Sequence, residues 1–183
     1  MEFSIVTISY NSEKSIFQTF QSVKNQSFNN YEYLLIDGGS SDSTLSIAKN
    51  QDHISKIVSE PDDGIYDALN KGIKNSTGEI IGFLNSDDTF YDENSLQHIA
   101  DAFDKETDCV LGDLIYTDKN ENMKRVWKGS EFKKGAFKKG WMPAHPTFYC
   151  RRSIYEKLGF YDDSYKIAGD FELMLRFLEK HNI

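Results

Sequence analysis

The chain has 183 residues, a hydrophobic content of 39% and a formal net charge of −8. This length is enough for one domain with a substantial core, and the composition is ordinary for a globular protein. The acidic balance argues against a general nucleic-acid binder, because phosphate backbones require a basic surface.

The first residues enter a strand pattern at once, without the basic region and long apolar stretch of a secretory signal. No apolar run approaches the roughly 20 residues needed to cross a bilayer. Cys109 and Cys150 are far apart in the sequence and lie in strand-like contexts. This predicts two reduced thiols in a cytoplasmic protein rather than a disulfide or a metal cluster.

The first half of the chain alternates between strand patterns and helix patterns. The predicted strands cover residues 3–9, 33–36, 54–58 and 81–84, and apolar residues at helical spacing lie between them at 16–23, 45–48 and 65–73. Such alternation predicts an α/β fold with a mostly parallel central sheet and helices on both faces.

Asp37 ends the second predicted strand and is followed by Gly38 and Gly39. Glycines let the backbone approach a ligand closely, and a carboxylate at a strand end is placed to accept hydrogen bonds from a base or ribose. The spacing is not that of the dinucleotide-binding fingerprint, and the chain has no Gly-Lys-Ser or Gly-Lys-Thr loop. A dehydrogenase is therefore disfavoured.

The fourth predicted strand ends abruptly in Asn85, Ser86, Asp87 and Asp88. Ligands of open α/β sheets gather beyond the carboxyl ends of the strands, so adjacent carboxylates there are well placed to hold a divalent cation that bridges two phosphates. The structural alternative is helix capping, with Asn94 at the start of a helix near residue 95.

The second half predicts a helix over residues 95–103, a return to the sheet at 109–112 and a hairpin formed by 114–117 and 124–127. Antiparallel additions to a parallel sheet are common. A strand over 147–150 and a short helix follow, and a last helix opens near 168–172.

Residues 124–141 combine basic and aromatic side chains, against the acidic background of the chain. They are Lys124, Arg125, Lys128, Lys133, Lys134, Lys138 and Lys139, among Trp127, Phe132, Phe137 and Trp141. One interpretation is a surface that meets anionic lipid headgroups or a diphosphate-linked acceptor. The alternative is an amphipathic segment whose lysines are solvated while its aromatic residues pack on the core.

Two single residues in the last third also have the chemistry of a site. His145 lies between two prolines, where it would reach a metal or a phosphate, or else be structural. Asp170 lies near a helix N-terminus, where it is either a helix cap or a general base.

Five motifs in this order resemble the family 2 inverting glycosyltransferases, many of which serve bacterial surface-polysaccharide assembly. The motifs are Ser9-Tyr10-Asn11, residues 36–42, residues 63–72, residues 78–88, and His145-Pro146-Thr147 with Gly169-Asp170. The resemblance spans nearly the whole chain and implies a single GT-A domain over residues 1–183. The sequence stops without a terminating segment, so we expect a C-terminal truncation.

The resemblance implies a hexosyltransferase that binds a nucleoside-diphosphate sugar, with a UDP-sugar favoured, together with Mg²⁺ or Mn²⁺. Asp170 would be the catalytic base, and Asp87 and Asp88, with His145 as a further candidate, the metal ligands. The nucleotide-sugar residues would be Ser9, Tyr10, Asn11, Asp37, Gly38, Lys71 and Asp87. The acceptor would be a saccharide or a polyprenol-diphosphate-linked sugar, with peripheral contact to an anionic membrane at the inner face of the plasma membrane.

The sequence departs from the family pattern at two points. Asn85 replaces the frequent first Asp of the D-x-D motif, which leaves open whether Asp87 or Asp88 ligates the metal. Leu69 stands where many members have Arg, so Lys71 would supply the positive charge toward the diphosphate, or else be a solvated lysine. Two other functions stay open. One is a sugar-phosphate nucleotidyltransferase, although this sequence lacks the glycine-rich, Arg-containing N-terminal loop of such enzymes. The other is a non-catalytic nucleotide-sugar-binding module.

Overall fold

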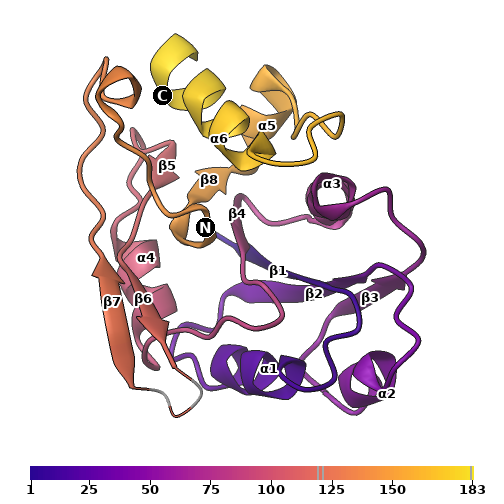
Figure 1. Cartoon of the computed structure of the whole chain (residues 1–183). Coiled ribbons are helices and arrows are strands. Elements are labelled where there is room, and N and C mark those ends of the chain that lie inside the picture. Colours follow the sequence, from indigo (N-terminus) through magenta and orange to yellow (C-terminus); the bar gives the residue numbers. More distant parts are fainter. Residues whose placement is uncertain (119, 121, 182) are drawn as a thin grey trace.

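A six-stranded sheet forms the centre of the protein in a computed structural model that describes residues 1–118, 120, 122–181 and 183 (Figure 1). Its strand order is β3-β2-β1-β4-β8-β5. The strands are β1 (Phe3–Ser9), β2 (Tyr31–Asp37), β3 (Lys56–Ser59), β4 (Ile80–Phe83), β5 (Cys109–Val110) and β8 (Tyr149–Arg151). The first four are parallel, whereas β8 runs antiparallel to both β4 and β5.

The helices cover both faces of this sheet, as Figure 1 shows. The helices α1 (Ile16–Lys24), α2 (Thr44–Lys49) and α4 (Ser95–Asp101) share one hydrophobic cluster. On the opposite face lie α3 (Ile65–Asn75), α5 (Arg152–Leu158) and α6 (Gly169–Met174), and α6 continues as the π-helical η3 (Leu175–Lys180). None of the helices in these described ranges is long and apolar enough to cross a membrane.

Burial on both faces explains why the central strands are almost entirely apolar. All seven residues of β1 are buried, and they alternate between the two clusters: Phe3 and Ile5 pack on one face, Val6 and Ile8 on the other. Gly82 in β4 leaves room for a neighbour, because a Cβ atom there would lie 1.9 Å from the Tyr149 ring. The predicted α/β architecture with a mostly parallel sheet is confirmed.

The predicted hairpin is present, but it forms a sheet of its own. Its strands β6 (Leu114–Thr117) and β7 (Met123–Trp127) pair antiparallel as a two-stranded ribbon. The antiparallel member of the central sheet is β8 instead, preceded by the short 3₁₀ helices η1 (Phe137–Lys139) and η2 (His145–Thr147). The predicted polar turn at 118–122 includes residues 119 and 121, which lie outside the described residues.

The prediction of two reduced thiols is wrong. Cys109 of β5 lies directly opposite Cys150 of β8, and the two form a disulfide with their Cα atoms 4.2 Å apart. The two cysteines are separated by 41 positions in the sequence, so no local pattern predicts their contact. Only the pairing of β5 with β8 brings them together. Disulfides are rare in reducing compartments, so the cysteines no longer support a cytoplasmic location.

Candidate functional site

The candidate site lies where the carboxyl ends of β1, β2 and β4 meet. From β1 the chain moves outward through β2 to β3, and then α3 returns it to β4 on the other side of β1. This reversal of strand order leaves a crevice between neighbouring loops, the usual ligand position in open α/β sheets. The loops after β1 and β4 touch there, since the hydroxyls of Ser12 and Ser86 are 2.8 Å apart.

Asp37 organises the end of β2. Its carboxylate is 1% exposed and accepts hydrogen bonds from the hydroxyls of Ser9, Ser40 and Ser59 and from the amides of Gly39 and Ser40. Burial by itself would raise the pKa of Asp37, but the hydrogen bonds outweigh it and the pKa is lowered. The carboxylate is therefore charged and already supplied with donors from its own chain.

The neighbouring loops present a polar and aromatic surface. Tyr10 is 65% exposed, and its ring lies 3.5 Å from where a Cβ atom on Gly38 would be. That same Cβ atom would lie 2.3 Å from the Asp62 carboxylate, so only glycine fits between the two side chains. Asn11, in the left-handed region at φ 49°, accepts a hydrogen bond from the Ser41 amide and joins the loops after β1 and β2.

Lys71 lies on α3 and is engaged by its own chain. Its ammonium group donates to the carbonyl of Pro61 at 2.8 Å and contacts the carboxylates of Asp67 and Glu60 at 3.1 and 3.3 Å. The positive charge of Lys71, which was predicted to face the diphosphate of the donor, is thus paired with two carboxylates of its own chain.

Asp87 and Asp88 follow β4, as predicted from the sequence. Asp87 is exposed, whereas Asp88 is half-buried and accepts a hydrogen bond from the side-chain amide of Asn85 at 2.9 Å. Burial raises the pKa of Asp88; the Asn85 hydrogen bond opposes this, and the charge of Asp87 adds to it. Neither acid caps α4. Asn94 occupies the predicted N-cap position, but its side chain makes no capping hydrogen bond and accepts one from Ser27 instead.

The acidic loop suits a cation that is completed by a ligand. In the described part of the chain no group of three or more His, Cys, Asp or Glu side chains is arranged to hold a metal. Mg²⁺ is commonly bound through one or two carboxylates together with substrate phosphates and water. Two adjacent carboxylates whose repulsion a cation would relieve fit that pattern, so the residues present match Mg²⁺ or Mn²⁺.

Asp170 is the second residue of α6 and is half-buried. The N-cap position belongs to Ala168, and no side chain caps this helix, so the capping alternative for Asp170 is not supported. Instead, Asp170 Oδ1 lies 3.3 Å from the hydroxyl of Tyr66. Burial and then the charge of Asp170 raise the pKa of Tyr66.

His145 links the Asp170 side of the site to β4. Its ring stacks on Phe83, the last residue of β4, with ring centroids 6.3 Å apart, and its Nε2 is 2.7 Å from the hydroxyl of Tyr161. Burial lowers the pKa of His145, and the charge of Asp170 acts in the opposite direction. Because Nε2 already has a hydrogen-bond partner, the structure gives His145 a structural contact, and its role as a metal ligand stays a prediction.

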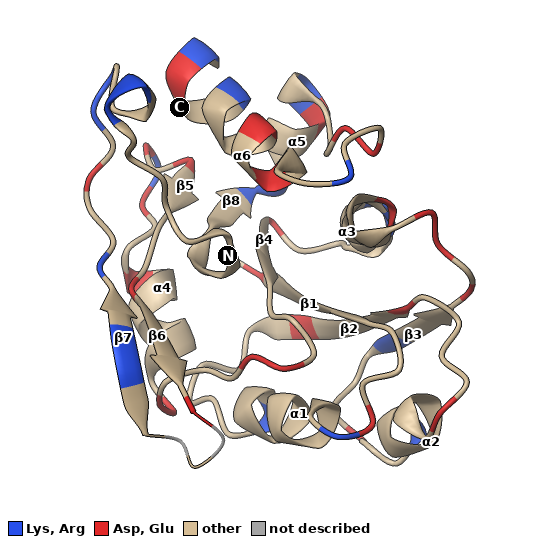
Figure 2. Ribbon diagram, viewed as in Figure 1, with Lys and Arg blue, Asp and Glu red and all other residues tan. Residues whose placement is uncertain are grey.

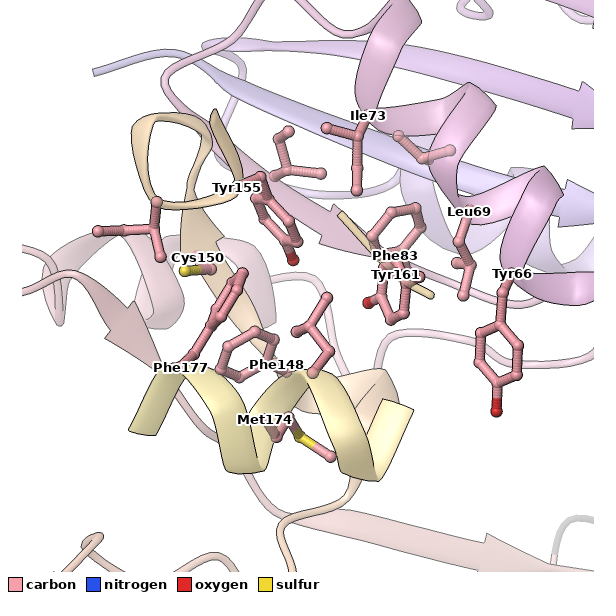
Figure 3. Close-up of a cluster of buried hydrophobic side chains, with 14 of the residues drawn as sticks. Tyr66, Leu69, Ile73, Phe83, Phe148, Cys150, Tyr155, Tyr161, Met174 and Phe177 are labelled. Carbon is pink, nitrogen blue, oxygen red and sulfur yellow. The ribbon is translucent and has the colours of Figure 1, made fainter. Parts of the chain in front are cut away.

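The sequence did not single out Tyr66 and Tyr161, which Figure 3 shows in the buried cluster with Phe83 and Tyr155. Tyr66 stacks on Tyr161 with ring centroids 5.9 Å apart, and together they connect Asp170 with His145. The only signal in the sequence was the place of Tyr66 inside the motif at 63–72. Nothing in the sequence pointed to Tyr161.

The protein has a GT-A nucleotide-diphospho-sugar transferase fold. Solved structures share it: S. aureus TarS 1-349 in complex with UDP-GlcNAc aligns with TM-score 0.72 and 22% identity, covering 96% of this chain and 53% of that one. The mannosyltransferase PcManGT from Pyrobaculum calidifontis, in complex with GDP-Man and Mn²⁺, aligns with TM-score 0.72 and 16% identity, covering 96% and 51%. This chain thus spans about half of each solved protein.

The relationship in sequence is more specific than the fold. Residues 4–169 match the profile of Glycosyl transferase family 2, so the chain belongs to that family. A PGL/p-HBAD biosynthesis glycosyltransferase of Mycobacterium tuberculosis is 31% identical over 182 residues, covering 95% of this chain and 68% of the relative. The resemblance identified from the five motifs is confirmed.

Proposed function

We propose that the protein transfers a sugar from a nucleoside-diphosphate sugar, with a UDP-sugar favoured, to a hydroxyl of a saccharide or lipid-linked acceptor in bacterial surface-polysaccharide synthesis. The observation that carries this proposal is the family match over residues 4–169, which includes all three site loops and ends one residue before Asp170. The complex of TarS with UDP-GlcNAc supports a UDP-sugar as the donor. Because PcManGT was solved in complex with GDP-Man, GDP-sugars are included in the donor panel below.

In this proposal the donor occupies the crevice at the ends of β1, β2 and β4. The exposed ring of Tyr10 offers a face for a nucleoside base. Asp37 holds the backbone of its loop in place, and a direct contact of its carboxylate with a base requires it to exchange one of its present donors. The residues assigned to the nucleotide sugar are Ser9, Tyr10, Asn11, Asp37, Gly38, Lys71 and Asp87. To contact the diphosphate, the Lys71 ammonium group must break its ion pair with Asp67 or with Glu60.

Asp87 and Asp88 would hold Mg²⁺ or Mn²⁺. A bound ion would act as a Lewis acid that neutralises the negative charge developing on the leaving diphosphate. The adjacent acids and the Mn²⁺ in the PcManGT structure support this assignment.

Asp170 is proposed as the general base. It accepts the proton of the acceptor hydroxyl while that oxygen bonds to the anomeric carbon and the bond to the diphosphate breaks. The bonding electrons leave with the nucleoside diphosphate. One displacement of this kind inverts the anomeric centre.

The basic segment, residues 124–141, is the proposed contact with an anionic membrane. It contains seven Lys or Arg residues and one acid, so it is positive by six while the rest of the chain is negative by fourteen. Figure 2 shows this charge along β7 and the chain that follows it. Phe132, Phe137 and Trp141 pack on the core, as the amphipathic alternative predicted, whereas Met123 and Val126 remain 58% and 39% exposed.

Charge complementarity and exposed apolar side chains together favour an anionic bilayer surface. Vesicle sedimentation tests this contact, with phosphatidylcholine vesicles compared with vesicles that also contain phosphatidylglycerol. Lys138→Glu with Lys139→Glu should weaken binding to the anionic vesicles, and Lys49→Glu with Lys105→Glu should not. Equal binding to both kinds of vesicle would contradict the proposal. The cytoplasmic location stays a prediction that depends on this contact and on the family resemblance.

Thermal stabilisation by a panel of nucleoside diphosphates and their sugars, with and without Mn²⁺, tests the proposed donor. A ligand that binds only the folded protein raises its apparent stability. We expect a metal-dependent shift with UDP or a UDP-sugar, and release of nucleoside diphosphate that Asp170→Asn abolishes while the shift remains. A shift without any transfer by the full-length protein would favour a binding module. Consumption of a sugar phosphate with a nucleoside triphosphate would favour a nucleotidyltransferase.

A further inference from the structure

The hydrogen bonds around Tyr66 have a definite direction. The backbone amide of Gly169 donates to the Tyr66 hydroxyl at 2.8 Å in a buried contact. An amide can only donate, so the hydroxyl oxygen accepts there and its own proton is free to be donated. Asp170 Oδ1 lies 3.3 Å from the same hydroxyl and accepts that proton. One tyrosine thus holds two consecutive residues at the start of α6.

The ring of Tyr66 is itself fixed in place. It is 8% exposed and stacks on the buried ring of Tyr161. A Cβ atom on Gly169 would lie 2.9 Å from the Tyr66 ring, so this contact requires glycine at 169. The preceding Ala168 adopts the left-handed region at φ 63°, which turns the chain into α6 beside the ring. The hydroxyl therefore has little freedom to move away from Asp170.

This contact leaves the other carboxylate oxygen available. Among the described residues, the Tyr66 hydroxyl is the one hydrogen-bond partner of the Asp170 side chain. A base must hold its free oxygen within hydrogen-bond reach of the proton it removes, and small errors in that position lower the rate strongly.

We propose that Tyr66 is a positioning residue: its hydroxyl holds Oδ1 of Asp170, so that Oδ2 faces the acceptor hydroxyl. This proposal rests on the role of Asp170 as the base in the function proposed above. Tyr66 itself does not touch the reacting atoms and exchanges no proton with the substrate.

Tyr66→Phe tests the proposal because it removes the hydroxyl and keeps the ring. Release of UDP from UDP-GlcNAc with Mn²⁺, or from the panel member that reacts fastest, measures the rate in the full-length protein. We expect kcat to fall about 10- to 100-fold while the KM for the donor stays within about twofold.

Tyr155→Phe is the matched control. Tyr155 is buried in the same cluster, and in the described part of the chain its hydroxyl makes no hydrogen bond to Gly169 or Asp170, which contact Tyr66. This variant should keep both the wild-type kcat and the wild-type KM for the donor. An equal loss in both variants would mean that the cluster acts through packing, which overturns the proposal.

The two levels of proposal fail in different ways. An active wild-type enzyme whose kcat is unchanged by Tyr66→Phe would overturn the role of Tyr66 alone. A wild-type enzyme that neither transfers nor hydrolyses any sugar of the panel would overturn the proposed function, and the role of Tyr66 with it.

Discussion

The hydroxyls of Ser12 and Ser86, 74 positions apart in the sequence, lie 2.8 Å from each other and join the loop after β1 to the loop after β4. These loops border the crevice at the reversal of strand order, and the second one carries Asp87 and Asp88. The bond thus sets the distance between the side of the site assigned to the nucleoside and the side assigned to the metal.

Ser86→Ala should weaken donor binding without unfolding the protein. A hydrogen bond of this kind contributes about 0.5–1.5 kcal/mol, so we expect the Kd for UDP to rise roughly 2- to 10-fold. Isothermal titration calorimetry measures the Kd, and Ser95→Ala, outside the crevice on α4, is the control. An unchanged Kd in Ser86→Ala would show that the loops keep their spacing without this bond.

Asp37→Asn should destabilise the fold, because an amide NH₂ would face hydroxyl and amide donors that the carboxylate now accepts. Loss of hydrogen bonds to a buried charge costs about 1.5–3 kcal/mol. Since the folded-state pKa of Asp37 is lowered, its contribution is present above the ordinary Asp range and is lost as the pH falls through the folded-state pKa.

The difference between wild type and Asp37→Asn should therefore shrink in acid. Urea unfolding at pH 7 and at pH 3 measures the free energy of unfolding at both values. Asp52→Asn, at an exposed ion pair with Lys24, is the control and should leave the free energy of unfolding close to that of wild type at both pH values. A difference between wild type and Asp37→Asn that does not depend on pH would contradict the lowered pKa.

Asp88→Asn should separate stability from binding. The raised pKa of Asp88 means that ionisation costs the folded protein stability, and this cost appears as the pH rises from the ordinary Asp range through the folded-state pKa. At pH 7 the ligand-free variant should melt at the wild-type temperature or above it. The stabilisation by UDP with Mn²⁺, about 2.7 kcal/mol at a hundredfold excess over Kd, should be lost.

Thermal melting with and without these ligands measures both effects of Asp88→Asn. Asp101→Asn on α4 is the control and should behave as wild type in both conditions. Full metal-dependent stabilisation of Asp88→Asn would remove Asp88 as a ligand and leave Asp87.

Reduction of the disulfide between Cys109 and Cys150 should lower stability. Cross-linking residues 41 positions apart restricts the unfolded chain, which corresponds to about 4 kcal/mol in the chain-entropy estimate. Thiol titration of the unfolded, unreduced protein should detect no free thiol, and the melting temperature should fall after reduction. Detection of two thiols per chain in that titration would restore the prediction of reduced cysteines.

Local patterns predicted the parts of the fold that depend on local sequence. The apolar run of β1 and the helical spacing in α1 and α3 each identified an element, and their alternation predicted the parallel sheet. Asp87 and Asp88 lie at the predicted edge because the end of a buried strand fixes where the following residues can be.

Contacts between distant segments were beyond that reasoning. The sequence predicted a strand over 147–150, where β8 lies, but the insertion of β8 between β4 and β5 depends on pairing over long separations. The donors that surround Asp37 and the acids that hold Lys71 are likewise known only once loops are placed. Tyr66 and Asp170 are separated by 104 positions, so no local pattern relates them.

The separation of charge between the basic segment and the rest of the chain gives the molecule a large electric dipole moment. A dipole experiences a torque in an electric field, so near an anionic surface the orientation in which β7 and the chain after it face that surface has the lower electrostatic energy. The torque acts only within about one Debye length, roughly 8 Å at physiological ionic strength. The surface therefore orients the protein only over the last few ångströms before contact. Added salt shortens this distance, because it shortens the Debye length.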